Sequence, residues 1–558
     1  MFLLNTILLV LSAAFLALAI IKNSRSCQAG SAVTDAGSLR MNRRLYMALL
    51  LSVLLFGIAA RLWQFGIIPG GVNQDGAMAG VDGKALADYG TDRFGTWLPC
   101  HLYAWGFGQM SSLLSYMVAP LVRLFGLSVV TLRLPLLIAS VFGALFFYLF
   151  MRDIFGPEVG LISAFIVAVN PWHFMQSRWA LDCNLLPHFF MGGLYFLNRG
   201  LSGKKRFLYI SMVFFGLCMY CYGITVYTIP LFLLVVCIFY TVKKRLSFTD
   251  AAGCALVYLL IAWPFILTMA VNFFRWDSIA LPFVTIQYFP DSIRSGDILF
   301  FSGHPLQQLR KNICSLTNIT ILQRRDLPWN DMPGFGTMYL FTLPFAAGGL
   351  IQLHRSSAGS EKQLVLFSLL TGIWVGLVTD SVNVNRVNII FYALMMLNVL
   401  GIYYILQALP KTLIPMLCAF VLSASLMLGT YFGGYAGEIK YYFYGGFGEA
   451  LEAAEASGAD RLYICLGEEH ANSQATAEIL TLFYDRTDAQ YFQGKDVSSD
   501  GRLPYRERYT YISSCAELSE LTGSAGAAFV APARSASVFD GNGYTVTVCG
   551  SYCAAVKN

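Results

Sequence analysis

Residues 45–75 read LYMALLLSVLLFGIAARLWQFGIIPGGVNQD, which is an apolar segment, then a turn rich in glycine and proline, then a carboxylate, Asp75. An α-helix needs about 20 apolar residues to cross the hydrocarbon core of a membrane, and residues 45–65 supply that length. The sequence therefore predicts a membrane-spanning helix that delivers a polar loop, from residue 66 onward, to one membrane surface.

Further apolar segments of similar character predict twelve spans in all. The other eleven lie near residues 1–21, 131–152, 158–174, 185–199, 206–222, 224–241, 251–270, 337–353, 363–379, 388–408 and 412–432. The stretch 111–126 is apolar as well, but Pro120 interrupts it, which favours an interfacial or re-entrant helix. No basic residue precedes the first span, so we expect an uncleaved anchor with its N-terminus outside; a signal peptide is the alternative.

The composition agrees with a polytopic membrane protein. Of the 558 residues, 56% are hydrophobic and 13% are charged, and the mean hydropathy is +0.59. An ordinary soluble domain carries roughly 25% charged residues. This balance excludes a disordered, fibrous or nucleic-acid-binding chain, so we expect membrane lipid, and not nucleic acid, as a partner.

Basic residues predict the orientation of the spans. They occupy the loops that follow odd-numbered spans: Lys22, Arg25, Arg40, Arg43, Arg44, Lys204, Lys205, Arg206, Lys243, Lys244, Arg245, Arg355, Lys362 and Lys411. Cytoplasmic loops of membrane proteins are rich in Lys and Arg. We therefore expect a multi-pass protein of the cell membrane whose loops 66–130 and 271–336, turn 380–387 and tail lie outside the cytoplasm.

The chain divides into three predicted parts: an anchor helix with a basic loop (1–44), a transmembrane domain (45–432) and a soluble domain (433–558). Residues 451–558 carry a net charge of −6, whereas the preceding residues carry +12. Alternating patterns predict strands at 461–467, 508–512 and 527–533, a helix at 473–486 and a closing strand at 544–550. The predicted fold is a mainly α membrane bundle with a small C-terminal α/β domain.

Four cysteines lie in this tail, namely Cys465, Cys515, Cys549 and Cys553. An oxidising exterior permits disulfides between them, with three possible complete pairings. The chain has no C-x-x-C and no H-E-x-x-H motif, so we predict no metal-ligand cluster; a divalent-cation site built from carboxylates stays open.

Two carboxylates follow the second span. Asp75 precedes a short helical stretch, and Asp82 lies seven residues later, which on a helix places both on one face, about 10 Å apart. Two interpretations are open. The carboxylate of Asp75 acts as a base, or Asp75 caps a helix that begins at Gly76 and Asp82 is merely solvated.

Other polar candidates lie in outer loops. Arg178 and Asp182 are four residues apart, so they either pair on one helical turn or present the arginine to an anion at the membrane surface. Arg386 either snorkels to the interface or offers its planar fork to a phosphate, in a pocket formed by the flanking asparagines, of which Asn388 is one. His304 is a proton carrier or a loop hydrogen-bonder.

Several of these motifs, in this order, resemble the C-type membrane glycosyltransferases. They are PGGVNQD at 69–75, G-x-D at 90–92 with Pro99, LFGLSVVTLRLP at 124–135, NPWHFMQSRW at 170–179 and NVNRVNIIF at 383–391. The likeness covers residues 45–400 and is nearest to the family 39-like branch, which includes protein O-mannosyltransferases and the aminoarabinose transferases of lipid A. Family members commonly carry Asp-Glu where this chain has Asp75-Gly76, and Asp82 is the candidate substitute for the missing carboxylate.

The resemblance implies a glycosyltransferase that moves a sugar from a polyprenyl monophosphate to an acceptor (protein, lipid or glycan) arriving from outside. It implies that Asp75 is the catalytic base. Charge on the departing lipid phosphate has to be held, for which Arg386 and then Arg178 are suited. Direct displacement inverts the anomeric centre, and the activated donor makes a cofactor unnecessary. Two alternatives stay open, a lipid-linked saccharide transporter and a non-catalytic scaffold.

Overall fold

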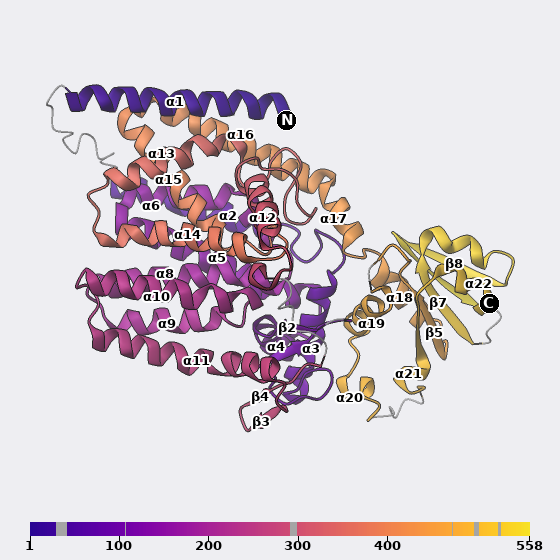
Figure 1. Ribbon diagram of the computed structural model, residues 1–558. Helices are drawn as coiled ribbons and strands as arrows, with labels where there is room; N and C mark the ends of the chain where they lie inside the picture. The colour runs from indigo at the N-terminus through magenta and orange to yellow at the C-terminus, as the bar shows by residue number, and fades with distance from the viewer. Residues whose placement is uncertain are drawn as a thin grey trace.

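The computed structural model describes residues 1–28, 42–106, 108–290, 298–470, 472–495, 502–522 and 526–557. Most of the helices run side by side in one large bundle, and a smaller domain with a β-sheet projects from one end of it (Figure 1). This arrangement confirms the predicted fold class, a helical membrane bundle with a small C-terminal α/β domain.

Each of the twelve predicted spans contains a helix. In chain order these are α1 (Phe2–Gln28), α2 (Arg43–Leu62), α5 (Val129–Phe155), α6 (Pro157–Val169), α8 (Leu186–Leu201), α9 (Arg206–Cys218), α10 (Ile229–Val242), α11 (Phe248–Phe274), α13 (Leu343–Arg355), α14 (Gln363–Val378), α15 (Ile390–Ala408) and α16 (Leu413–Thr430). Within the described residues, eight helices are long and apolar enough to cross a membrane. The other four, α6, α8, α9 and α13, have 13 to 16 residues.

Proline explains where several of the shorter helices begin. Pro157, Pro187 and Pro344 each occupy the first or second position of a helix, in α6, α8 and α13. The fixed φ of proline suits the first helical turn, where no intrahelical N–H donor is needed. The chain can therefore restart a helix after a break, and the irregular segments before α8 and α13 carry polar residues at one end of the bundle.

Short elements cover that end of the bundle, beside the C-terminal domain (Figure 1). They are α3 (Gln74–Tyr89), β1 (His101–Tyr103), β2 (Gln109–Ser111), α4 (Leu113–Phe125), α7 (Pro171–Gln176), β3 (Ile279–Leu281), β4 (Val284–Ile286) and α12 (Pro305–Thr320), with 3₁₀ turns η1 (Asp182–Leu185), η2 (Gly223–Tyr227), η4 (Leu299–Phe301) and η5 (Leu340–Thr342). The stretch predicted at 111–126 to be a helix other than a span is α4, which retains Pro120 in its interior.

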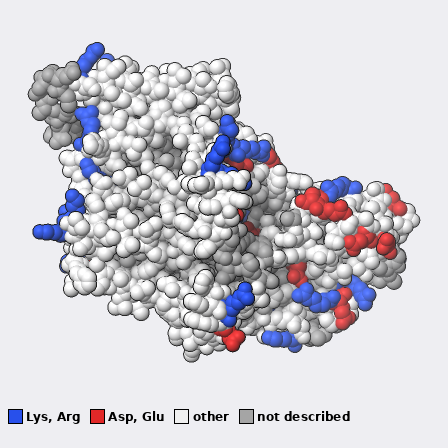
Figure 2. All heavy atoms as spheres, in the orientation of Figure 1, with Lys and Arg blue, Asp and Glu red and all other residues white. Residues whose placement is uncertain are grey.

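Charged side chains gather at the two ends of the molecule (Figure 2). At the end far from the C-terminal domain, the exposed Lys204, Lys205, Lys243 and Lys244 lie in the loops after α8 and α10. In this view the helical body between the ends is almost free of charge, and the C-terminal domain carries both signs. An uncharged band between polar ends is the surface expected of a protein that crosses a membrane.

The C-terminal domain is built on a five-stranded sheet in the order β6-β5-β7-β9-β8. The last helix of the bundle continues from α16 into α17 (Ala436–Tyr442), which leads to this domain. The elements of the domain are α18 (Phe447–Glu455), β5 (Arg461–Cys465), α19 (Ser473–Tyr484), α20 (Ala489–Phe492), α21 (Tyr505–Arg508), β6 (Tyr509–Ile512), α22 (Leu518–Leu521), β7 (Ala527–Pro532), β8 (Tyr544–Cys549) and β9 (Tyr552–Lys557). β5, β6 and β7 are parallel, and β9 is antiparallel to β7 and β8.

The closing strand predicted at 544–550 is present as β8, at one edge of the sheet. A further strand, β9, was not predicted, and it lies between β7 and β8. The sequence of β9, YCAAVK, gives only a weak strand signal because alanine has low strand propensity. Its alanines are nevertheless buried, since small side chains let the sheet pack closely on both faces.

Two of the four cysteines in this domain lie close enough together to form a disulfide. The Sγ atoms of Cys465 and Cys515 lie 3.1 Å apart, whereas Cys549 and Cys553 face Tyr552 and Val548 across the β8–β9 pair. Mild oxidation is therefore expected to join Cys465 to Cys515 in a disulfide. Closing a loop of this length stabilises a folded domain by roughly 4 kcal/mol in the chain-entropy model.

Peptide mapping of the oxidised protein under non-reducing conditions checks this pairing. The Cys465–Cys515 cross-link is expected as the main product, and Cys515→Ser should abolish it without creating another. Recovery of Cys549 or Cys553 linked to Cys465 would show that the thiols are not arranged as described.

Candidate active site

Arg178, one of the two candidate phosphate ligands, has a structural role here. Its side chain is fully buried, and its two terminal nitrogens donate to five backbone carbonyl oxygens in and just after the end of α2, between residues 60 and 68. The guanidinium also lies over the rings of Phe174, Tyr431 and Phe432. The two terminal nitrogens of Arg178 are therefore already engaged by the protein itself, which favours a structural role over phosphate binding.

Replacing Arg178 is expected to destabilise the fold. In an Arg178→Gln variant several buried carbonyl oxygens lose a charged donor, at a cost of about 1–3 kcal/mol for each group left unpaired. We expect the apparent Tm in detergent to fall by several degrees. The matched control is Arg123→Gln, because Arg123 is exposed and donates to a single carbonyl oxygen, that of Ala87; an equal fall in both variants would contradict this role.

Hydrogen bonds to two other parts of the chain also fix the loop between α2 and α3. Arg133 of α5 donates to the carbonyl oxygens of Pro69 and Gly71 at 2.9 and 2.7 Å. The N–H of Val72 donates to the carbonyl oxygen of Phe443 at 2.8 Å. Gly71 has a φ of +78°, and a Cβ there would lie 2.1 Å from that same oxygen. This turn therefore requires glycine, and it fixes the start of α3.

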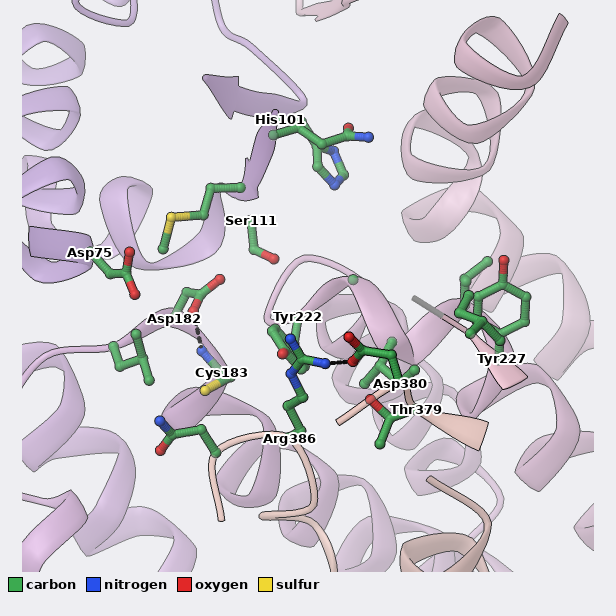
Figure 3. Close-up of a pocket in the computed structure, with 18 of the residues that line it drawn as sticks. Asp75, His101, Ser111, Asp182, Cys183, Tyr222, Tyr227, Thr379, Asp380 and Arg386 are labelled. Carbon is green, nitrogen blue, oxygen red and sulfur yellow. Dashed lines mark hydrogen bonds and ion pairs between the residues drawn. The ribbon is translucent and has the colours of Figure 1, made fainter. Parts of the chain in front are cut away.

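Asp75 lies in the first turn of α3 and lines a cavity. The cap of this helix is Asn73, whose side-chain oxygen accepts the N–H of Asp75, so the alternative in which Asp75 is the cap is wrong. The carboxylate of Asp75 accepts a hydrogen bond from the indole N–H of Trp105. Asn73 therefore caps the N-terminus of α3, and the carboxylate of Asp75 lies at the cavity (Figure 3).

The cavity has a volume of about 260 Å³ and lies at the end of the bundle beside the C-terminal domain. Drug-sized ligands occupy sites of roughly 300 Å³ or more, so this cavity suits a group the size of one sugar ring. Four charged residues line it, Asp75, Asp182, Asp380 and Arg386. They come from α3, from η1 and from the turn between α14 and α15, which are far apart in the sequence.

Asp182, not Asp82, is the second carboxylate near Asp75. Both Asp75 and Asp182 line the cavity (Figure 3), and one carboxylate oxygen of Asp182 accepts the N–H of Cys183 at 2.7 Å. A Cβ on Gly76 would lie 2.9 Å from the carbonyl oxygen of Ala180. The close approach of these two segments leaves no room for a glutamate at residue 76.

Asp82 serves the fold instead. It is fully buried, it forms an ion pair with Arg93 at 2.6 Å, and it accepts the backbone N–H of Arg93 at 3.0 Å. Burial raises the pKa of Asp82 to about 6 even though Arg93 acts in the other direction. Asp82 does not line the cavity, so the interpretation of Asp82 as solvated is wrong, and it does not replace the missing family carboxylate.

Arg386 lies at the cavity and forms an ion pair with Asp380 (Figure 3). Its side chain is 20% exposed, so it can reach a ligand. The turn that carries it is fixed by two contacts. The N–H of Arg386 donates to the side chain of Asn383 at 3.0 Å, and the N–H of Val384 donates to Asp326 at 2.9 Å. The guanidinium is therefore presented from a rigid turn and is oriented by Asp380.

The remaining candidates lie outside the cavity. Asn388 is fully buried and donates to the carbonyl oxygen of Cys183, so it ties the Arg386 turn to the segment of Asp182. His304 is exposed at the start of α12, where its N–H donates to Ser302, which fits the loop interpretation. Within the described ranges no group of three or more His, Cys, Asp or Glu side chains is close enough to hold a metal ion.

The sequence reasoning missed several residues that line the cavity. They are His101, Gln109, Ser111, Tyr222, Tyr227, Thr379 and Asp380. None of them belongs to a motif with recognisable spacing, because they converge only when the β1–β2 hairpin, η2 and the α14–α15 turn come together. The one available signal was Asp380, six residues before Arg386 and of opposite charge.

Comparisons with known proteins agree with this architecture. Residues 111–288 match the family model described as dolichyl-phosphate-mannose-protein mannosyltransferase. The crystal structure of ArnT from Cupriavidus metallidurans bound to undecaprenyl phosphate matches 92% of this chain and 97% of its own, with a TM-score of 0.54 and 12% identity. The apo oligosaccharyltransferase of Archaeoglobus fulgidus matches 70% of this chain and 56% of its own, with a TM-score of 0.46 and 13% identity. No curated protein sequence matches the chain.

The matched family segment includes Arg133, Arg178 and Asp182 but neither Asp75 nor Arg386. The ArnT structure shows that the fold extends over nearly the whole chain. Together, the family match and the shared fold confirm the resemblance to C-type membrane glycosyltransferases that the sequence motifs indicated.

Proposed function

We propose that this chain transfers a sugar from a polyprenyl-phosphate donor to a nucleophilic acceptor on the extracytoplasmic side of the membrane. The single observation that supports this most is the cavity that holds Asp75, on α3, and Arg386, on the α14–α15 turn. A carboxylate that accepts a proton and a guanidinium that binds a phosphate are the two groups that this transfer needs.

In the proposed reaction an acceptor hydroxyl or amine attacks the anomeric carbon of the donor sugar. Asp75 takes the proton of the acceptor as the new bond forms. The bond from the anomeric carbon to the phosphate oxygen breaks, and its electron pair leaves with the polyprenyl phosphate, whose negative charge Arg386 holds. A single displacement of this kind inverts the anomeric centre. The donor is already activated, so we propose no further cofactor.

The lipid character of the donor has support from the comparisons. ArnT, whose fold the chain shares, was solved with undecaprenyl phosphate bound, and the matching family is named for dolichyl phosphate mannose. Both ligands are polyprenyl phosphates. The cavity opens at the end of an apolar helical bundle, where a lipid phosphate is expected to lie at the headgroup level while its chain stays among the helices or in the bilayer.

The proposed orientation rests on charge. The loops after α8 and α10, which carry exposed lysines, lie at the end of the bundle that is opposite the C-terminal domain (Figure 1). Basic loops stay in the cytoplasm. The cavity and the C-terminal domain are therefore proposed to face outward. Protease digestion of a C-terminal epitope tag on intact spheroplasts tests this, since a protected tag would contradict the orientation.

The function is tested by incubating the purified protein with polyprenyl-phosphate sugars and a crude acceptor extract. Release of free polyprenyl phosphate that depends on the extract, together with labelling of an acceptor, is the expected result. Movement of an intact lipid-linked sugar across vesicles without release would instead support the transporter alternative. If the folded protein shows neither release nor movement, the result supports the scaffold alternative.

A further inference from the structure

The cavity has two chemically different sides. Asp75, Asp182, Asp380 and Arg386 occupy one side, and His101 and Ser111 of the β1–β2 hairpin lie across from Arg386 (Figure 3). The hairpin pairs His101 with Ser111 and Tyr103 with Gln109. Because side chains alternate along a strand, His101, Gln109 and Ser111 share one face, and all three line the cavity. Met110 of β2 lines the cavity as well, so the hairpin contributes three uncharged polar side chains and one apolar side chain.

Two atoms of this hairpin are buried without a hydrogen-bond partner. They are Nδ1 of His101 and the side-chain carbonyl oxygen of Gln109. His101 is only 3% exposed. A buried polar atom that lacks a partner destabilises the fold unless a ligand or ordered water supplies one. Both atoms belong to residues that line the cavity, so the partner is expected to come from a molecule bound there.

The chemistry of the two groups defines that molecule. Burial lowers the pKa of His101 to about 4, so at neutral pH its ring is uncharged and offers one donor and one acceptor. The amide of Gln109 likewise offers both. A hydroxyl group is also both donor and acceptor, whereas a phosphate only accepts and an ammonium only donates. The hairpin therefore complements hydroxyl groups and itself carries no charge that could pair with an ionised sugar.

Aromatic rings complete the same region. The ring of His101 lies 5.0 Å from that of Phe265 in α11, which holds the imidazole in place. Two further aromatic residues line the cavity, namely Tyr222, which comes just before η2 and lies near Arg386, and Tyr227 of η2 (Figure 3). Aromatic side chains provide apolar faces against which the C–H groups of a sugar ring can pack, while its hydroxyl groups turn toward the hairpin.

We infer that His101, Gln109 and Ser111 form the subsite for the donor sugar and select a neutral, hydroxyl-bearing pyranose. This inference rests on the proposed function, because it places the sugar between the base and the phosphate-binding arginine. The hairpin determines which sugar is accepted, and Asp75 and Arg386 carry out the transfer.

The test compares donors and hairpin variants in the same release assay. The probes are polyprenyl phosphates that carry glucose, mannose or galactose, their monodeoxy analogues, and the corresponding 2-amino and uronic acid sugars. The wild type is expected to use at least one neutral hexose with a kcat/KM about 10-fold or more above those of the charged sugars. For at least one monodeoxy analogue of that hexose, kcat/KM should be about 10- to 100-fold lower than for the hexose itself, as expected when a buried polar group loses its hydrogen-bond partner.

His101→Phe keeps the ring and its contact with Phe265 but removes both nitrogens. It should lower kcat/KM for the hexose by a similar factor and should no longer distinguish the hexose from that deoxy analogue. His101→Asn places a polar atom near the position of Nδ1 and should restore much of the discrimination. A thermal melt of each variant shows whether it is folded.

The outcomes separate the two proposals. Release by the wild type from no donor overturns the proposed transfer and the subsite with it. Release by the wild type, with the deoxy penalty unchanged in His101→Phe, overturns the subsite alone. A preference for the amino or uronic acid donors would likewise contradict a neutral subsite while leaving the transfer intact.

Discussion

An Asp75→Asn variant is expected to release polyprenyl phosphate about 10²- to 10⁴-fold more slowly than the wild type, which is the contribution of a positioned general base. Asparagine keeps the size of the side chain and an acceptor for the indole N–H of Trp105, but it cannot take a proton. The KM for the donor should change little, because the proposed role of Asp75 is toward the acceptor. The loss should therefore appear in kcat.

Two controls interpret that result. Asp88→Asn changes a carboxylate on the same helix, where Asp88 pairs with Lys84 at the surface, and it should leave the rate unchanged. Asp182→Asn removes the other carboxylate on that side of the cavity. If Asp182→Asn abolishes release while Asp75→Asn does not, the base is Asp182 and the assignment of Asp75 is wrong.

An Arg386→Gln variant is expected to slow release by about 10²- to 10³-fold, the range seen when one preorganised group that stabilises developing charge is removed. Glutamine is neutral and lacks the planar fork that matches a phosphate. The donor KM should rise as well, because the phosphate is charged before and after transfer. Arg386→Lys should recover part of the rate, since it restores the charge without the fork.

Asp380→Asn helps to separate binding from orientation. It removes the ion pair with Arg386 and hence the competing negative charge beside the phosphate site. If Asp380 only competes with phosphate, the donor KM falls and kcat is kept. If Asp380 orients the guanidinium, kcat falls. An Arg386→Gln variant with wild-type kcat and KM would show that the phosphate is held elsewhere.

The departure from the family pattern at Gly76 has a physical explanation. Glycine at this position allows the first turn of α3 to approach Ala180 so closely that a Cβ would meet the carbonyl oxygen of that residue. The same approach brings the η1 segment, and with it Asp182, to the cavity that Asp75 lines. Helical spacing in the sequence points instead to Asp82, on the same helix, as the replacement for the missing carboxylate, because the sequence alone does not show which distant segments come together.

The arginines illustrate the same limit. Arg178 and Arg386 both follow a predicted span and both lie in polar motifs, so both were candidate phosphate ligands, with Arg386 ranked first. Arg178 is enclosed by the end of α2 and by aromatic rings, whereas Arg386 lines a cavity. The terminal nitrogens of Arg178 are bonded to backbone carbonyls more than a hundred residues away in the sequence. A local sequence pattern cannot predict such contacts.

The sequence by itself determined the fold class, because the lengths of apolar segments and the placement of lysine and arginine follow directly from the solvent that surrounds each residue. It also placed Asp75 at the end of a span and Arg386 at the start of another. Only the tertiary structure decided that Asp182 joins them, that Arg178 and Asp82 stabilise the fold, and that His101 and Gln109 face the same cavity. Burial and hydrogen-bond satisfaction are properties of segments brought together from distant parts of the chain, so they appear only once the chain has folded.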